Sequence, residues 1–142
     1  MFKEILLPVD LGDPGSSKKA RAVAIEFSQS AGAKLHVLTV VPGFGMSIVS
    51  QYFPKDFEKN VVEETEKQLA AFVAQRLPPE IEAQPMVALG TIYEEILGAA
   101  KRIGADLIVM AAHRPGLQDY LLGPNASRVV RHFKGSVMVV RD

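Results

Sequence analysis

The chain has 142 residues and a mass of 15.4 kDa, a length typical of one domain, so we expect a single domain over residues 1–142. Apolar residues make up 48% and charged residues 23%, which excludes disordered and coiled-coil classes. The 16 basic and 16 acidic residues balance, which argues against a nucleic acid partner. The absence of cysteine excludes disulfide scaffolds, thiolate metal sites and cysteine nucleophiles.

The amino terminus carries only a short apolar run before Pro8 and Asp10. This run is too short for a signal peptide or a membrane span. We therefore expect a cytoplasmic protein without a membrane partner.

Apolar runs and amphipathic segments alternate through the first half of the chain. Residues 5–9 and 35–41 are apolar runs that end at turn-forming residues, which predicts two buried strands. Between them, the apolar spacing predicts a helix over residues 16–31, capped by Ser16 and Ser17 and ended by glycine. Residues 44–54 have no period and are interpreted as a loop.

The second half of the chain repeats this alternation. A long helix is expected from residue 56 to residue 77, followed by a less regular strand over residues 81–89. Pro85 places that strand near a sheet edge. The remaining expected elements are a helix over 92–103, a strand over 107–112, a helix over about 124–133 and a strand over 136–140.

Strands that are apolar throughout and alternate with helices indicate a parallel sheet covered on both faces. The fold class expected is therefore α/β, a three-layer doubly wound sandwich with five parallel strands. In such sheets, ligands bind beyond the carboxyl ends of the strands, where the strand order reverses.

Two strand exits carry candidate binding residues. Asp10 follows Pro8 and Val9, and its carboxylate could accept hydrogen bonds from ribose hydroxyls, hold a metal ion, or cap its own turn. Val41, at the end of the second strand, could offer backbone groups to the edge of a base or simply end the strand. These alternatives stay open on the residues alone, and no metal can be named.

The third exit spans residues 111–127, where a strand, a glycine-containing loop and a helix start follow one another. This arrangement presents backbone N–H groups and a positive helix end to phosphate. The alternative is an ordinary connection in which Gly116 and Gly123 adopt positive φ and Pro124 is a first helical residue.

The sequence resembles the universal stress protein family over essentially its whole length. The resemblance rests on Ile-Leu-Leu-Pro-Val-Asp at residues 5–10, Gly-Thr at 90–91, residues 105–110, and Ser-Val-Met-Val-Val-Arg at 136–141. The stretches His-Arg-Pro at 113–115 and Leu-Leu-Gly-x-Asn-Ala at 121–126 look like the enterobacterial F and G branch. The resemblance implies an adenine nucleotide alpha hydrolase-like sheet with strand order 3-2-1-4-5.

Nucleotide-binding members of this family carry G-x2-G-x9-G followed by Ser or Thr, and the chain departs from that pattern. Ala111 replaces the first glycine, the second has no clear counterpart, and Pro124 replaces the hydroxyl residue; Gly123 matches. Proline removes one N–H donor and one hydroxyl. His113 and Arg114 could restore part of the attraction for phosphate.

The resemblance implies an adenine nucleotide, ATP or a relative, with or without Mg²⁺, between the first and fourth strands. Asp10 would face the ribose, while Val9 and Val41 would line the base. The complete set of expected binding residues is Pro8, Val9, Asp10, Val41, Ala111, His113, Arg114, Gly123, Asn125 and Ser127. No catalytic residue is expected, because the strand exits offer one acid and no phosphate-loop lysine, so ATP hydrolysis or autophosphorylation would be slow at most.

Two functions follow from these expectations. The first is a stress-responsive regulator that binds ATP, and the second is a nucleotide-independent dimeric interaction module with a degenerate phosphate loop. The resemblance implies a homodimer that pairs through the strand over 136–140, with larger assemblies open. An enzyme of the same architecture is disfavoured, since the G-x4-G-K-[ST] and G-x-G-x-x-G motifs are absent.

The overall neutrality conceals an uneven charge distribution. Residues 1–112 contain 11 basic and 14 acidic residues, whereas residues 113–142 contain 5 basic and 2 acidic residues. The positive segment begins at the expected phosphate loop, which favours a small anion there. His36 and His132 are interpreted as structural residues.

Overall fold

A computed structural model describes residues 2–42, 56–112 and 123–141. Its centre is a five-stranded sheet in the order β3-β2-β1-β4-β5, and every strand pair is parallel. This confirms the expected fold class and strand order. The strands are β1 (Glu4–Pro8), β2 (Lys34–Val41), β3 (Ala83–Leu89), β4 (Leu107–Ala111) and β5 (Ser136–Val140).

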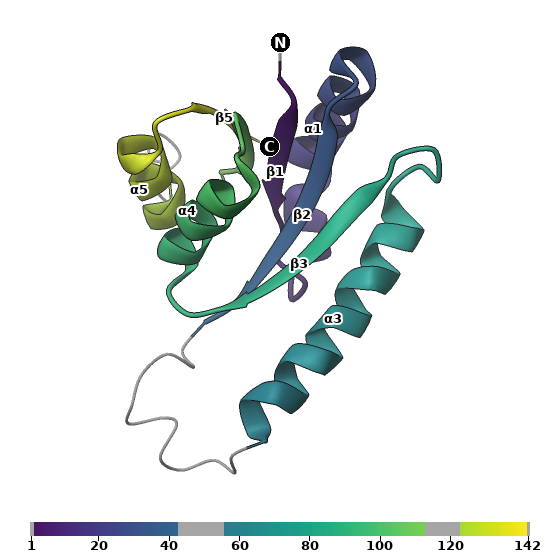
Figure 1. The fold of residues 1–142 in the computed structure, drawn as a ribbon, viewed down its shortest axis with the longest axis vertical. Coiled ribbons are helices and arrows are strands. Elements are labelled where there is room, and N and C mark those ends of the chain that lie inside the picture. The colour runs from purple at the N-terminus through teal and green to yellow at the C-terminus, as the bar shows by residue number, and fades with distance from the viewer. Residues whose placement is uncertain (1, 43–55, 113–122, 142) are drawn as a thin grey trace.

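The helices form one layer on each face of the sheet. Figure 1 shows α4 (Ile92–Ile103) and α5 (Pro124–His132) together on one side, and α3 (Phe57–Arg76) lying beside β3. A short 3-10 helix, η1 (Pro14–Ser17), precedes α1 (Lys18–Ala31). The layers of α1 with α3 and of α4 with α5 each cover their own apolar cluster.

Strand β1 supplies both clusters because its side chains alternate between the faces. Ile5 and Leu7 pack in the α1–α3 cluster and Leu6 packs in the α4–α5 cluster, all 0% exposed. Such burial is the main stabilising contribution to a domain of this size. It also explains why β1 reads as an unbroken apolar run in the sequence.

Strand order reverses at β1, which pairs with β2 on one side and with β4 on the other. The β1–β2 pairing covers five positions, whereas the β1–β4 pairing covers only Ile5 with Leu107 and Leu6 with Ile108. The two central strands are thus paired near their amino ends and not near their carboxyl ends. A crevice at those carboxyl ends is where ligands of doubly wound sheets bind.

The amino ends of β1 and β4 are joined by one carboxylate. Asp106 accepts hydrogen bonds from the backbone N–H groups of Lys3 at 2.9 Å and Glu4 at 3.2 Å. The Nε2 atom of His36 on β2 lies 2.8 Å from Oε2 of Glu4 on β1, so the structural interpretation of His36 is confirmed.

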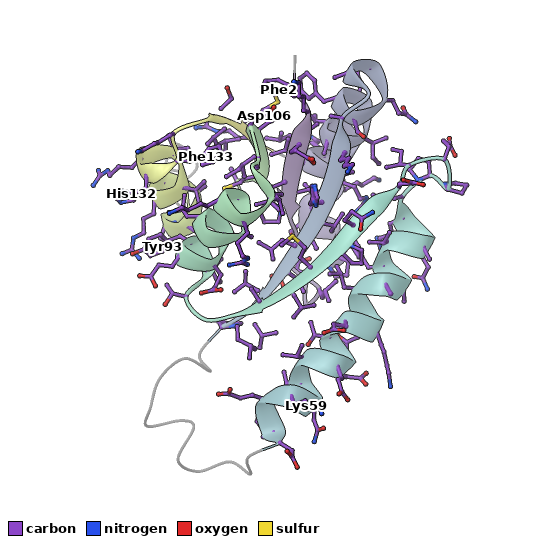
Figure 2. All side chains as sticks on the ribbon, viewed as in Figure 1. Phe2, Lys59, Tyr93, Asp106, His132 and Phe133 are labelled. Atoms are coloured by element: carbon purple, nitrogen blue, oxygen red, sulfur yellow. The ribbon has the colours of Figure 1, made fainter. Side chains whose placement is uncertain are left out.

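Figure 2 shows Tyr93 of α4 and His132 of α5 side by side, where their rings stack at a centroid distance of 6.4 Å.

The expected boundaries hold to within a few residues, with one correction at the first helix. Residues 14–17 form η1, and Ser17 is the N-cap of α1 without a side-chain cap hydrogen bond. Its hydroxyl donates instead to the carbonyl of Pro14 at 3.3 Å. Gly32 ends α1 with a φ of 65°, as predicted.

The two edge strands differ from the inner three. β3 is an edge strand that contains Pro85, as the sequence predicted. β5 is the other edge, and its residues 137–140 are only half-buried. Within the described residues, no helix is both long enough and apolar enough to cross a membrane.

Candidate functional site

A cavity of about 340 Å³ lies at the carboxyl ends of β1, β2 and β4. Its walls come from those strand ends, from η1, and from the first turns of α4 and α5. The lining residues are Pro8, Val9, Asp10, Ser16, Ser17, Leu38, Val40, Pro42, Ile92, Ile96, Met110, Ala111, Gly123, Pro124, Asn125 and Ala126. This is the strand-order reversal at which the sequence predicted a ligand.

One wall of the cavity is apolar. Leu38 of β2 and Met110 of β4 are buried, at 0% and 6% exposure, and Ile96 of α4 is 1% exposed. Val40 and Ile92 extend this wall. Apolar walls with a few polar groups are typical of sites that bind small molecules.

Among the described residues that line the cavity, Asp10 is the one that carries a charge. Its Oδ1 accepts a hydrogen bond from the backbone N–H of Gly12 at 2.9 Å, so the turn-capping interpretation is confirmed. Within the described part of the chain, its Oδ2 has no hydrogen-bond partner. One carboxylate oxygen therefore shapes the turn, while the exposed second oxygen remains available to a ligand.

The start of α5 forms the opposite wall. Gly123 is the N-cap residue with a φ of −61°, so the expectation of a positive φ at Gly123 is wrong. Pro124 follows as the first helical residue, which leaves this helix end with one N–H donor fewer. Asn125 lines the cavity and brings an amide group to it.

The cavity brings together six of the ten expected binding residues, namely Pro8, Val9, Asp10, Ala111, Gly123 and Asn125. His113 and Arg114 lie outside the described residues. Val41 is not among the lining residues, and its carbonyl accepts the N–H of Gly90 at 3.1 Å. Ser127 also lies away from the cavity, is exposed, and donates its N–H to Gly123 at 3.0 Å.

Ten of the 16 residues that line the cavity were not expected as site residues. Ile92 and Ile96 were assigned to the buried face of a helix, and Ser16 and Ser17 to a helix cap. The hydroxyl of Ser16 donates to the carbonyl of Asp13 at 2.7 Å. The sequence feature that could have pointed to Ile92 as a lining residue is the Gly90-Thr91 turn, because this turn sets where α4 begins.

No group of three or more His, Asp or Glu side chains that could hold a metal ion occurs in the described ranges. Asp10 supplies the one carboxylate among the described lining residues. A divalent cation at this site would need most of its ligands from a bound molecule or from water.

Comparison with known proteins agrees with this geometry. Universal stress protein G of Shigella flexneri is 33% identical over 144 residues, which cover 99% of this chain and 100% of that protein. The solved structure of universal stress protein UspA from Lactobacillus plantarum is 26% identical with a TM-score of 0.71, and the match covers 98% of this chain and 97% of that one.

A second solved structure is a universal stress protein in complex with cAMP. It is 21% identical with a TM-score of 0.65, and the match covers 98% of this chain and 97% of that one. The model of the universal stress protein family matches residues 1–141. Together with the relatives of the G branch, this match shows that the chain belongs to the universal stress protein family.

Proposed function

We propose that this chain is a stress-responsive regulator that binds ATP or another adenine nucleotide at the carboxyl ends of β1 and β4. The observation that carries the proposal is the cavity there, with an apolar wall, one carboxylate and a helix start. The cAMP complex of a protein with the same fold supports an adenine-containing ligand.

The three kinds of wall match the three parts of a nucleotide. The apolar wall around Met110 and Ile96 suits the base, because a planar ring gains most from burial against apolar side chains. The free Oδ2 of Asp10 suits a ribose hydroxyl, since a carboxylate accepts strong hydrogen bonds. The start of α5, with Asn125, suits phosphate because the helix end is positive.

Binding without rapid turnover is the expected behaviour. Among the described residues, the cavity lining contains Asp10 as its one acid and contains no lysine or arginine, so these residues supply no electrostatic clamp for phosphoryl transfer. The nucleotide would act by occupancy, and any Mg²⁺ would be carried on its phosphates. We expect this regulator to work in the cytoplasm.

The first experiment asks whether the ligand is an adenine nucleotide. Purified protein is denatured and the released small molecules are identified by mass spectrometry, after which adenosine, AMP and ATP are titrated by calorimetry. We expect adenine compounds to bind below millimolar concentration. If none of them binds below millimolar, the nucleotide proposal is lost.

A second experiment isolates the role of Asp10. Asp10→Asn keeps an oxygen for the N–H of Gly12 and so preserves the turn, but it removes the charge that faces the ribose. Because hydrogen bonds to charged groups contribute about 1.5–3 kcal/mol, adenosine should bind roughly ten- to a hundredfold more weakly. The matched ligand is 2′,3′-dideoxyadenosine, which should bind both proteins alike; an equal loss for both ligands would remove Asp10 from ribose recognition.

The alternative function, a nucleotide-independent dimeric interaction module, is favoured by Ala111 and Pro124, which depart from the family phosphate loop. Its dimer would form at β5, which pairs only with β4 in the described structure. Ser136 donates its N–H to Asp106, and Val140 accepts from Ala112. Since residues alternate along a strand, the backbone groups of Val137 and Val139 point away from β4.

Val139→Pro tests that dimer without removing a β4–β5 hydrogen bond. Proline removes an outward N–H and is tolerated on an edge strand, so the variant should remain folded and run as a monomer in size-exclusion chromatography with light scattering. Val139→Ala is the control and should remain dimeric. A dimeric Val139→Pro protein would exclude pairing through this edge.

A further inference from the structure

The α1–α3 layer holds two arginines around one aromatic ring. The guanidinium carbons of Arg21 in α1 and Arg76 at the end of α3 each lie 5.5 Å from the centre of the Phe72 ring. The two guanidinium groups are therefore separated by no more than twice that distance. Phe72 is only 5% exposed, so its ring is a buried support for both charged groups.

Neither arginine has an acidic partner among residues 2–42, 56–112 and 123–141. The ion pair found in those ranges joins His36 to Glu4. Within α1 and α3, the neighbours at helical spacing do not supply a carboxylate, since Lys18 and Ile25 flank Arg21 and Phe72 and Val73 precede Arg76. Glu80 follows Arg76 by four residues, beyond the end of α3, and is exposed. Positive charge is thus concentrated here, although α3 carries Glu58, Glu63, Glu64 and Glu66 elsewhere along its length.

This concentration has an energetic cost. Partial burial lowers the pKa of Arg21, and the nearby charge of Arg76 lowers it further. Arg21 is half-buried and Arg76 is exposed, so their like charges repel each other to a modest extent. An anion bound between them would relieve the repulsion.

The contacts leave the right atoms free for such an anion. A cation–π contact uses the flat face of a guanidinium group and leaves its in-plane N–H donors for other partners. Arg21 donates one of these to Ser17 Oγ, over a long distance of 3.4 Å. Planar forks of N–H donors match the oxygens of phosphate particularly well.

We propose that Arg21 and Arg76, held on Phe72, form a second binding site on the α1–α3 layer for a phosphate group. Ser17 links this site to the cavity, because it lines the cavity and accepts the hydrogen bond from Arg21. The phosphate group belongs either to free phosphate or to the terminal phosphate of a nucleotide in the cavity. Both sources present the same group to the two arginines, a phosphate whose oxygens accept hydrogen bonds from guanidinium N–H groups.

The test follows the side-chain Nε–H signals of arginine by ¹H–¹⁵N NMR while inorganic phosphate replaces sodium chloride at constant ionic strength. The signals of Arg21 and Arg76 should shift and saturate, whereas that of Arg102, on α4, should not move. Arg21→Gln and Arg76→Gln should each weaken the affinity for phosphate about tenfold or more, because each substitution removes a charge-assisted hydrogen bond. Arg21→Lys keeps the charge and checks that the fold survives, which circular dichroism verifies for every variant.

Adenosine and ATP then separate the two sources. If phosphate binds equally well with and without saturating adenosine, and ATP leaves the arginine signals unmoved, the source is free phosphate. If ATP shifts the arginine signals and excess phosphate adds nothing, the source is the nucleotide. The proposal is overturned if no phosphoryl compound moves the signals, or if Arg21→Gln and Arg76→Gln bind phosphate as tightly as the native protein. Phosphate binding without any adenosine or ATP binding would defeat the nucleotide proposal and leave this one standing.

Discussion

The helices of this protein differ in how much of their length is buried against the sheet. α4 buries Ile96, Ala99 and Ala100, and the nine-residue α5 buries Ala126 and Val129. In the α1–α3 layer, the 20 residues of α3 bury only Leu69 and Phe72, and Lys59 lies on the part of α3 that extends beyond the sheet (Figure 2). The α4–α5 layer is the one that contributes side chains of both its helices to the cavity.

This contrast implies that the α4–α5 layer contributes to ligand binding and to stability, whereas the buried residues of α3 contribute to stability. A ligand in the cavity touches α4 and α5 directly, so changes to that layer should affect stability and binding together. Changes to the buried residues of α3 should affect stability but not adenosine binding, because no residue of α3 lines the cavity. Three comparisons of variants test whether the two layers differ in this way.

The largest effect is expected for matched truncations in the two layers. Ile96→Ala and Leu69→Ala each empty a buried position, at 1% and 0% exposure, and should each lower the free energy of unfolding in urea by about 2–5 kcal/mol. Only Ile96→Ala should also weaken adenosine binding, as measured by calorimetry, since Ile96 is part of the apolar wall. Equal losses of adenosine affinity in both variants would show that the layers are not independent.

A smaller effect is expected for the glycines that precede or follow a helix in each layer. Gly90 leads into α4 with a φ of 144°, where a Cβ would lie 2.9 Å from Glu95 Oε2, so Gly90→Ala should cost about 1–3 kcal/mol. Gly32 ends α1 with a φ of 65° and has open space around it, so Gly32→Ala should cost about 1 kcal/mol. Urea unfolding measures both, and a larger loss at Gly32 would contradict this ranking.

The smallest effect concerns the phosphate end of the cavity. Pro124→Ser returns one N–H donor and one hydroxyl to the start of α5, a gain of about 0.5–1.5 kcal/mol for one added hydrogen bond. ATP should then bind roughly two- to tenfold more tightly in calorimetry, with adenosine unchanged.

Ser127→Ala is the control for that gain. Ser127 lies on the same helix but outside the cavity lining, so its replacement should leave ATP affinity unaltered. If Pro124→Ser strengthened adenosine as much as ATP, the added groups would not be acting on phosphate.

The sheet could be predicted from sequence because buried parallel strands leave a strong signal. The apolar runs around Leu7 and Val109 can be satisfied only by burial on both faces, and Pro85 marked an edge. Helical spacing was less informative at the site. Ile92 and Ile96 are one turn apart on the face that packs inward, and the same spacing describes a core position and a cavity wall.

Where the expected residues differ from the cavity lining, the difference concerns orientation rather than residue type. Two positions along a helix turn a side chain by roughly 200°, so Asn125 can face the cavity while Ser127 faces away. One position along a strand reverses the side chain, and so Val40 rather than Val41 lines the wall. Sequence patterns identify the strand exit but do not fix these rotations.

The short pairing between β1 and β4 leaves the two central strands of the sheet without hydrogen-bonded pairing toward their carboxyl ends. Hydrogen-bonded pairing joins the two strands at Ile5 and Leu6 and then stops, while Asp106 fastens their amino ends. A molecule seated in the cavity would touch both strands beyond that point, through Val9 on one side and Ala111 on the other. The ligand would then contact both strands in the region where they are not paired with each other. It would in this way connect β1 to β4 in the middle of the sheet.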